Sequence, residues 1–342
     1  MLRIIFKNKK LLYPLVVLLF SMACKEEIRH VEIENVSLKL PLHRFENELF
    51  AIKGPKPNAQ IKSIESKYPV FYKLFTKYII RSEDKSDSTS VVNLMHFVND
   101  SEIQTVYKET ADLYKDLSAE ETQLTDAFKR YTKCFPGKPV PTVFTFISGF
   151  NYAIISADSL LGIGLDMYLG AACKYYPALG LPKYKTNNMR REYIVSDAMK
   201  GWMQSEYAID ETKKDFLSHI IYYGKLLYFQ DLVLPQTSDS LKIGYTEKQL
   251  KWCEKNEASV WSFFISQKLL YNASYADYHK FINEGPTTNG FPKEAPSLLG
   301  NWIGWQIVRT YMKEHPAMTL PQLFAEMDAQ KILTKSGYKP KK

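Results

Sequence analysis

The chain has 342 residues, of which 45% are hydrophobic, and its 45 basic and 37 acidic side chains give a formal net charge of +8. A chain of this length and hydrophobic content can bury a large core. The charges are interspersed, with no basic block before the tail at residues 335–342, so nucleic acid is excluded as an expected partner.

The N-terminus has the layout of a secretory signal. A basic stretch and a ten-residue apolar run, interrupted by Pro14, lead to the sequence SMAC, which ends at Cys24. SMAC resembles a bacterial lipobox, in which a small residue precedes a cysteine that is lipidated and becomes the mature N-terminus. We therefore predict a lipoprotein signal peptide over residues 1–23, a lipidated tether over residues 24–30, and attachment to a lipid bilayer through Cys24. The alternative is an ordinary cleaved signal with an incidental cysteine.

Removal of the signal changes the charge and the cysteine balance. The signal contains four basic and no acidic side chains, so 41 basic and 37 acidic side chains remain and the net charge falls to +4. After Cys24 the chain has Cys134, Cys173 and Cys253. This odd, widely spaced set allows at most one disulfide and argues against a thiolate zinc site, so we expect buried free thiols.

The first part of the mature chain is predicted to be mainly helical. Residues 31–40, VEIENVSLKL, alternate apolar and polar side chains and predict a short strand, followed by a helix that starts near His43. Helical patterns then continue until a segment rich in proline, Cys134 to Pro141, punctuates the chain.

The centre of the domain is predicted at three apolar runs. The first two, Val143–Ile147 and Tyr152–Ile155, are separated by polar residues and glycine, and they predict a β-hairpin. The third run, Leu160–Leu165, contains two glycines, which in a strand mark a bulge or the close approach of another backbone. Asp166 follows directly, so this strand is expected to present one carboxylate at the edge of the sheet.

The remaining chain has the apolar spacing of successive helices. The predicted helices cover residues 188–206, 212–229, 246–271, 300–312 and 321–332. Residues 231–239 are expected to form a loop. In the fourth of these helices Gly300 and Gly304, four residues apart, would let another backbone pack closely.

Together these patterns predict an α+β fold that is predominantly α-helical with a small central β-sheet. We expect a single globular domain over residues 31–342. It would consist of a helical N-terminal layer over residues 31–135 and the β-hairpin with a helical core over residues 140–342.

No complete catalytic or metal-binding motif is present. A zincin metalloprotease needs two histidines four residues apart on a helix, and none of the six histidines is within ten residues of another. Glu192 could stand where the glutamate of that motif stands, with Arg191 and Val195 at the ligand positions. A degenerate zincin-like fold is therefore the alternative architecture, and an ordinary exposed Glu192 is the simpler one. We expect no metal and no cofactor.

Three carboxylates are the candidate residues of a degenerate cleft. Asp166, Glu192 and Glu257 could form a cluster for general acid catalysis or for Ca²⁺ binding. More often such residues are satisfied separately by arginines or by the backbone. The candidate partners are Arg190, Arg191 and Arg309.

Several segments in one order resemble the gliding motility lipoprotein GldB family. These segments are GFNYAI (149–154), GIGLDMYLG (162–170), REYIVSD (191–197), GKLLY (224–228), IGYTEKQLKWCEKNEASVW (243–261) and GNWIGWQIVRTYM (300–312). The helix-rich half is also similar to distantly related predicted zinc proteases, which keep the histidine pair that this chain lacks.

The resemblance implies an outer-membrane lipoprotein, on the periplasmic face or at the cell surface, that the gliding apparatus and the coupled type IX secretion machinery need. It implies a non-enzymatic role and partners among the other envelope proteins of that machinery. No catalytic residue carries over, and Cys24 carries over as the lipid site. The alternative is an envelope hydrolase or peptidase with an acid-based or metal-poor site.

Overall fold

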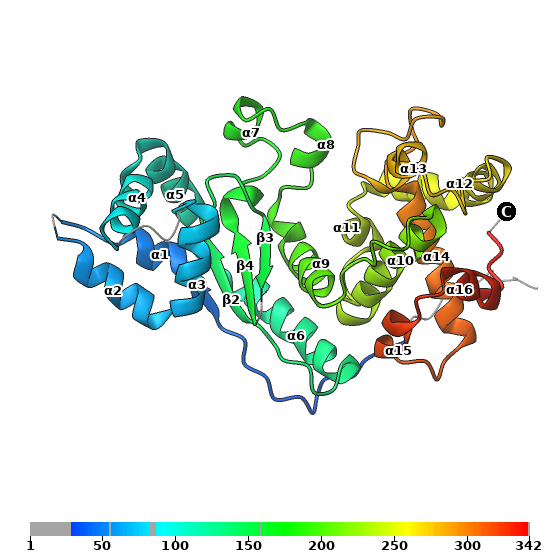
Figure 1. Ribbon diagram of the computed structural model, residues 1–342, viewed down its shortest axis with the longest axis horizontal. Helices are drawn as coiled ribbons and strands as arrows, with labels where there is room; N and C mark the ends of the chain where they lie inside the picture. Colours follow the sequence, from blue (N-terminus) through cyan, green and yellow to red (C-terminus); the bar gives the residue numbers. More distant parts are fainter. Residues whose placement is uncertain (1–28, 55, 83–86, 158, 341–342) are drawn as a thin grey trace, which may run out of the picture.

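The computed structural model of the protein describes residues 29–54, 56–82, 87–157 and 159–340 (Figure 1). The predicted signal peptide and Cys24 lie outside the described residues. Within the described ranges, no helix is both long and apolar enough to cross a membrane. Helices predominate around one four-stranded sheet, which confirms the predicted α+β class.

The sheet stands between two groups of helices (Figure 1). Its strands are β1 (Leu42–Arg44), β2 (Thr142–Phe146), β3 (Ile154–Ala157) and β4 (Leu160–Gly164). Their spatial order is β1-β2-β4-β3, in which β1, β2 and β4 are parallel and β3 runs antiparallel to β4.

The predicted hairpin between the first two central runs is wrong, because β4 lies between β2 and β3. The hairpin forms instead from β3 and β4, with Ile155 opposite Gly162. The loop after β2 is held away from a tight turn, since the backbone N–H groups of Ser148 and Phe150 donate to the carboxylate of Asp166. Strand β4 pairs with β2 along this edge, with Thr142 opposite Leu160.

The predicted close approach of another backbone is confirmed at Gly164, whereas the close neighbour of Gly162 is a side chain. A Cβ on Gly164 would lie 2.0 Å from the carbonyl oxygen of Tyr152, and a Cβ on Gly162 would lie 2.5 Å from Cγ1 of Ile155. A side chain at either position would push β3 and the segment before it away from β4.

The predicted strand over residues 31–40 is also wrong, although its alternation is real. Leu38 and Leu40 turn toward the core while Ser37 and Lys39 are exposed. The segment buries its apolar side chains against helices and has no ladder partner among the described strands. An alternation of buried and exposed side chains shows that one side of an extended segment faces the core and the other faces solvent. It does not by itself require pairing in a sheet. The first helix then begins at Phe45, directly after β1.

The first helical group covers one face of the sheet. Its elements are α1 (Phe45–Phe50), α2 (Asn58–Lys67), α3 (Pro69–Leu74), the π-helix η1 (Phe75–Ile79), α4 (Asp87–Asn99) and α5 (Ser101–Leu113). Their apolar side chains share one core with Phe144 and Phe146 of β2. The ring of Phe71 stacks on that of Phe144 with 4.1 Å between the ring centroids, an arrangement that adds to the effect of area burial.

The second helical group covers the other face. Its longer helices are α6 (Ser118–Cys134), α9 (Ile194–Glu206), α10 (Phe216–Val233), α12 (Glu247–Ser266) and α14 (Leu299–Glu314). The shorter ones are η2 (Leu165–Tyr168), α8 (Lys183–Thr186), η3 (Arg191–Tyr193), α11 (Asp239–Ile243), α13 (Tyr275–Ile282), α15 (Leu320–Ala325) and α16 (Ala329–Ser336). The short helix α7 (Tyr175–Ala178) instead places Tyr175 against the first core. Val143, Leu161 and Ile163 of the sheet belong to this core. Since strand side chains alternate between faces, neighbouring residues of β2 serve different cores.

The second core is built around the contact between α10 and α14. A Cβ on Gly304 would lie 1.8 Å from the carbonyl oxygen of Ile220, and a Cβ on Gly224 would lie 2.3 Å from the carbonyl oxygen of Gly304. The predicted close packing at Gly304 is therefore confirmed. The neighbouring Trp302 and Trp305 are buried in the core.

We predict that Gly304→Ala destabilises the protein by about 3 kcal/mol or more, because the added methyl group overlaps backbone atoms and the two helices must separate. Urea unfolding of the purified protein measures this loss. Gly285→Ala is the matched control, since its Cβ would lie 3.6 Å from the carbonyl oxygen of Thr287, an ordinary van der Waals contact. Its effect should stay within about 0.5 kcal/mol. Equal losses in the two variants would contradict the close-contact argument.

Candidate functional site

Asp166 lies directly after β4 in the short helix η2, and its side chain is fully buried. Its Oδ1 accepts a hydrogen bond from the N–H of Ser148 at 2.9 Å. Its Oδ2 accepts from Ser148 Oγ at 2.9 Å and from the N–H of Phe150 at 2.6 Å. Burial raises the pKa of Asp166 to about 6, although these hydrogen bonds act to lower it. The carboxylate thus holds the loop after β2 in place.

The other two predicted carboxylates have different surroundings. Glu192 is exposed in η3, with its Oε1 3.7 Å from Nη1 of Arg190. Glu257 is buried on α12, and its Oε1 accepts a hydrogen bond from the Tyr338 hydroxyl at 2.8 Å. Glu257 therefore ties the C-terminal segment to α12.

The structure gives the three predicted carboxylates different partners. Arg190 is a partner of Glu192, as the sequence suggested, whereas Arg191 pairs with Glu120. In the part of the chain that the structure describes, no group of three or more His, Cys, Asp or Glu side chains could hold a metal ion. A joint role for the three in one cleft stays a prediction.

Sequence reasoning missed a buried ion-pair cluster at Asp231. The expected loop at this residue is wrong, because α10 continues to Val233. Asp231 accepts from Arg309 Nε at 2.7 Å, from Trp305 Nε1 at 2.8 Å and from Lys242 Nζ at 2.9 Å. These contacts join α10, α11 and α14. The one signal in the sequence is an aspartate inside the apolar run YFQDLVL, and its partners lie too far along the chain for spacing to reveal them.

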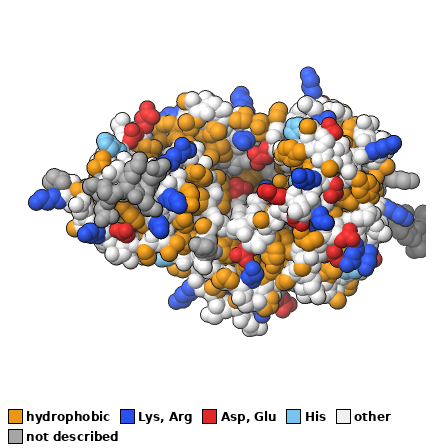
Figure 2. Space-filling model, in the orientation of Figure 1, with side chains coloured by type: hydrophobic (Ala, Val, Ile, Leu, Met, Phe, Trp, Pro, Cys, Tyr) orange, Lys and Arg blue, Asp and Glu red, His pale blue; other side chains and the backbone are white. Residues whose placement is uncertain are grey.

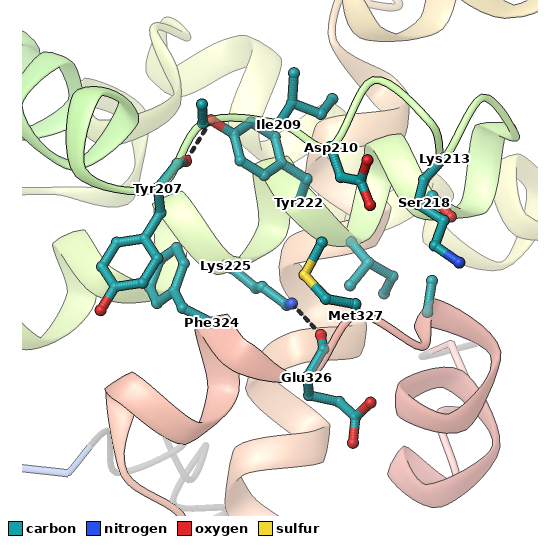
Figure 3. A pocket seen from close by; sticks show the side chains of 13 residues that line it. Tyr207, Ile209, Asp210, Lys213, Ser218, Tyr222, Lys225, Phe324, Glu326 and Met327 are labelled. Atoms are coloured by element: carbon teal, nitrogen blue, oxygen red, sulfur yellow. Dashed lines mark hydrogen bonds between the residues drawn. The ribbon is translucent and has the colours of Figure 1, made fainter.

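A pocket of about 100 Å³ lies between α10, the segment after α9 and the α15–α16 region (Figure 3). The residues that give it apolar walls are Tyr207, Ile209, Ile221, Tyr222, Phe324 and Met327. The predicted single helix over residues 321–332 is wrong here, because the chain breaks into α15 and α16. Asp328 caps α16 by accepting from the N–H of Lys331 at 2.8 Å. The break supplies one side of the pocket.

Lys225 of α10 also lines this pocket, and sequence reasoning missed it too. Its side chain is buried, and its Nζ donates to the carbonyl oxygen of Glu326 at 2.6 Å (Figure 3). It thereby bonds a carbonyl at the C-terminal end of α15, as lysines near helix ends do. Burial lowers the pKa of Lys225 to about 8, against the charge of Glu326, which raises it. A lysine within the apolar run GKLLYF was the available signal.

Asp197, in the first turn of α9, is a further carboxylate with a raised pKa. Its Oδ2 accepts a hydrogen bond from the Tyr168 hydroxyl at 3.0 Å. Burial raises the pKa of Asp197 to about 6, while the charge of Lys200 and the bond from Tyr168 lower it.

The molecule is hollowed near the middle of the face drawn in Figure 2, with acidic side chains around the hollow.

A family model described as gliding motility protein GldB matches residues 26–340. The chain therefore belongs to the GldB family. The matched range includes both cores, the three predicted carboxylates and the pocket, and it confirms the resemblance of the sequence segments. The family is one of gliding motility lipoproteins, which fits an anchored envelope protein. No curated protein and no solved structure matches the chain, and the zincin-like alternative is not supported.

We predict that Asp166→Asn costs about 2 kcal/mol of stability, because the amide group would place an NH₂ against an N–H donor that now has an acceptor. Urea unfolding at neutral pH measures this cost. Asp197→Asn is the matched control, since its remaining oxygen can still accept from Tyr168, and it should cost less. If the two variants lose the same free energy, Asp166 does not act as a clamp.

Proposed function

We propose that this GldB family member is an outer-membrane lipoprotein that serves the gliding and type IX secretion machinery as a non-catalytic interaction component. The family match over residues 26–340 carries the proposal. Lipidated Cys24 would be the anchor, and other envelope proteins of the machinery would be the partners.

Arg29, which follows Cys24 closely in the sequence, indicates which surface of the domain an anchor would hold at the membrane. Arg29 lies against the turn between α14 and α15, where its Nη1 donates to the carbonyl oxygens of Pro316 at 3.4 Å and Met318 at 3.3 Å. Cys24 precedes Arg29 by five positions, a length that spans at most about 18 Å when fully extended. A lipid on Cys24 would therefore hold the α14–α15 turn close to the membrane surface.

The surroundings of the carboxylates support a non-catalytic role. Asp166 and Glu257 are buried and bonded to groups that fix neighbouring segments. Glu192 is exposed beside Arg190. Asp166 and Glu257 therefore lack the access to a substrate that a general acid or base needs, and the pairing of exposed Glu192 with Arg190 is an ordinary surface contact.

Cys24→Ala should release the protein from the membrane fraction and abolish gliding, because a single unlipidated chain end has no bilayer affinity comparable to that of acyl chains. Immunoblots of membrane and soluble fractions, together with a cell-spreading assay, measure both effects. Cys173→Ala is the control, since Cys173 is a partly buried free thiol in the folded domain, and it should leave both unchanged. Normal gliding with Cys24→Ala would contradict the anchor.

Glu192→Gln should leave gliding intact and change stability by less than about 0.5 kcal/mol, because the exposed carboxylate makes one weak ion pair. The assay is cell spreading by a strain whose sole copy carries the substitution. Loss of gliding by folded, membrane-bound protein would count against the non-catalytic role and in favour of an envelope hydrolase.

A further inference from the structure

The pocket at Lys225 contains a buried positive charge without an ion-pair partner. Lys225 is 6% exposed. Among the residues that the structure describes, no carboxylate oxygen lies within 4.0 Å of its Nζ, and its hydrogen bond goes to the backbone carbonyl of Glu326. An ammonium group has three N–H donors, so two remain for another acceptor. Buried charges are normally paired, and an anion would complete this site.

The walls around this ammonium are apolar and aromatic. Tyr207 and Phe324 pack with 4.6 Å between their ring centroids. The hydroxyl of Tyr222 is already used, since it donates to the carbonyl oxygen of Tyr207 at 3.0 Å. The ring of Tyr222 and the side chain of Met327 complete the lining that Figure 3 shows around Lys225. A pocket of about 100 Å³ can hold a group the size of one apolar side chain or a short acyl chain.

The two acidic side chains of the lining already have partners. Asp210 Oδ1 accepts from the N–H and the hydroxyl of Thr212 at 2.9 Å and 2.6 Å. The carboxylate of Glu326 pairs with Lys331 and accepts from the N–H of Asp328 at 3.1 Å. Lys213, also in the lining, adds a second positive charge. Lys225 is therefore the buried cation of the lining and Lys213 an exposed one, while both carboxylates of the lining already have donors of their own.

We infer that this pocket binds a small apolar carboxylate, whose anionic group contacts Lys225 and whose apolar body lies against Tyr207, Tyr222 and Phe324. The C-terminal residue of a polypeptide and a free short-chain fatty acid both have this chemistry. The inference goes beyond the proposed function and does not depend on it, because it concerns binding by the purified protein and not anchoring or gliding.

The test is isothermal titration of the full chain in detergent at pH 7 with three probes. The probes are a short peptide that ends in isoleucine with a free carboxylate, the same peptide with a C-terminal amide, and hexanoate. We expect at least one free acid to bind, and amidation to weaken the peptide at least tenfold if the peptide binds. Binding by the peptide alone identifies a chain terminus as the ligand, binding by hexanoate alone identifies a fatty acid, and binding by both supports the shared chemistry.

Lys225→Met should weaken binding of the free acid at least tenfold, because it keeps the length and apolar stem of the side chain and removes the charge. Lys335→Met is the matched control and should change affinity less than twofold, since Lys335 is exposed and does not line the pocket. If Lys225→Met fails to fold, Lys213→Gln at the exposed second cation should still lower the affinity several-fold.

The pH dependence gives an independent readout on the unmodified protein. The ammonium of Lys225 loses its charge as the pH rises through about 8, so the affinity for a carboxylate should fall between pH 7 and pH 9.5. The inference is overturned if neither acid binds at millimolar concentration, or if binding is indifferent to Lys225→Met, to amidation and to pH.

Discussion

The contact between α10 and α14 is the constraint on which the second core depends. The backbones of Gly224 and Gly304 approach there so closely that neither position has room for a Cβ. The two helices can therefore cross only where these glycines face each other. Gly224 and Asp231 are seven residues apart and therefore lie on the same face of α10. The glycine fixes the distance between the helices, and the bonds from Asp231 to Trp305 and Arg309 fix their rotation. Apolar packing alone would fix the distance between the helices and their rotation less specifically than these directional contacts do.

The sheet connects the second core to the first helical group. Strand β2 gives Val143 to one core and Phe144 to the other, so each core positions the strand that the other needs. A buried polar contact also crosses this boundary, where Glu46 of α1 accepts from Thr145 of β2 at 2.8 Å. Arg44 of β1 pairs with the same carboxylate at 2.5 Å. The two helical groups therefore share strand β2, which contributes side chains to both cores.

The sequence predicted the structure correctly where a feature depends on residues that are close together in the chain. Glycines four residues apart predicted the helix contact at Gly304, and glycines in an apolar run predicted the close approach at Gly164. It failed where the cause lies far along the chain. The order of β2, β4 and β3 rests on the parallel pairing of β2 with β4, in which Thr142 lies opposite Leu160, 18 positions away. The charge of buried Asp231 is compensated by Arg309, 78 positions away. Periodicity contains no information about such partners.

The pocket follows from the same helix that organises the core. Because successive helical residues are about 100° apart around the axis, the contact of Gly224 with α14 turns the next residue, Lys225, toward the α15–α16 side. Helix α10 thus buries two charged side chains, Asp231 and Lys225, of which only Asp231 has oppositely charged partners. Asp231 accepts four hydrogen bonds, two from Arg309 and one each from Lys242 and Trp305, whereas Lys225 donates to one backbone carbonyl. An apolar residue of similar volume would avoid the desolvation cost of a buried charge, so the lysine makes physical sense where an anion completes its coordination.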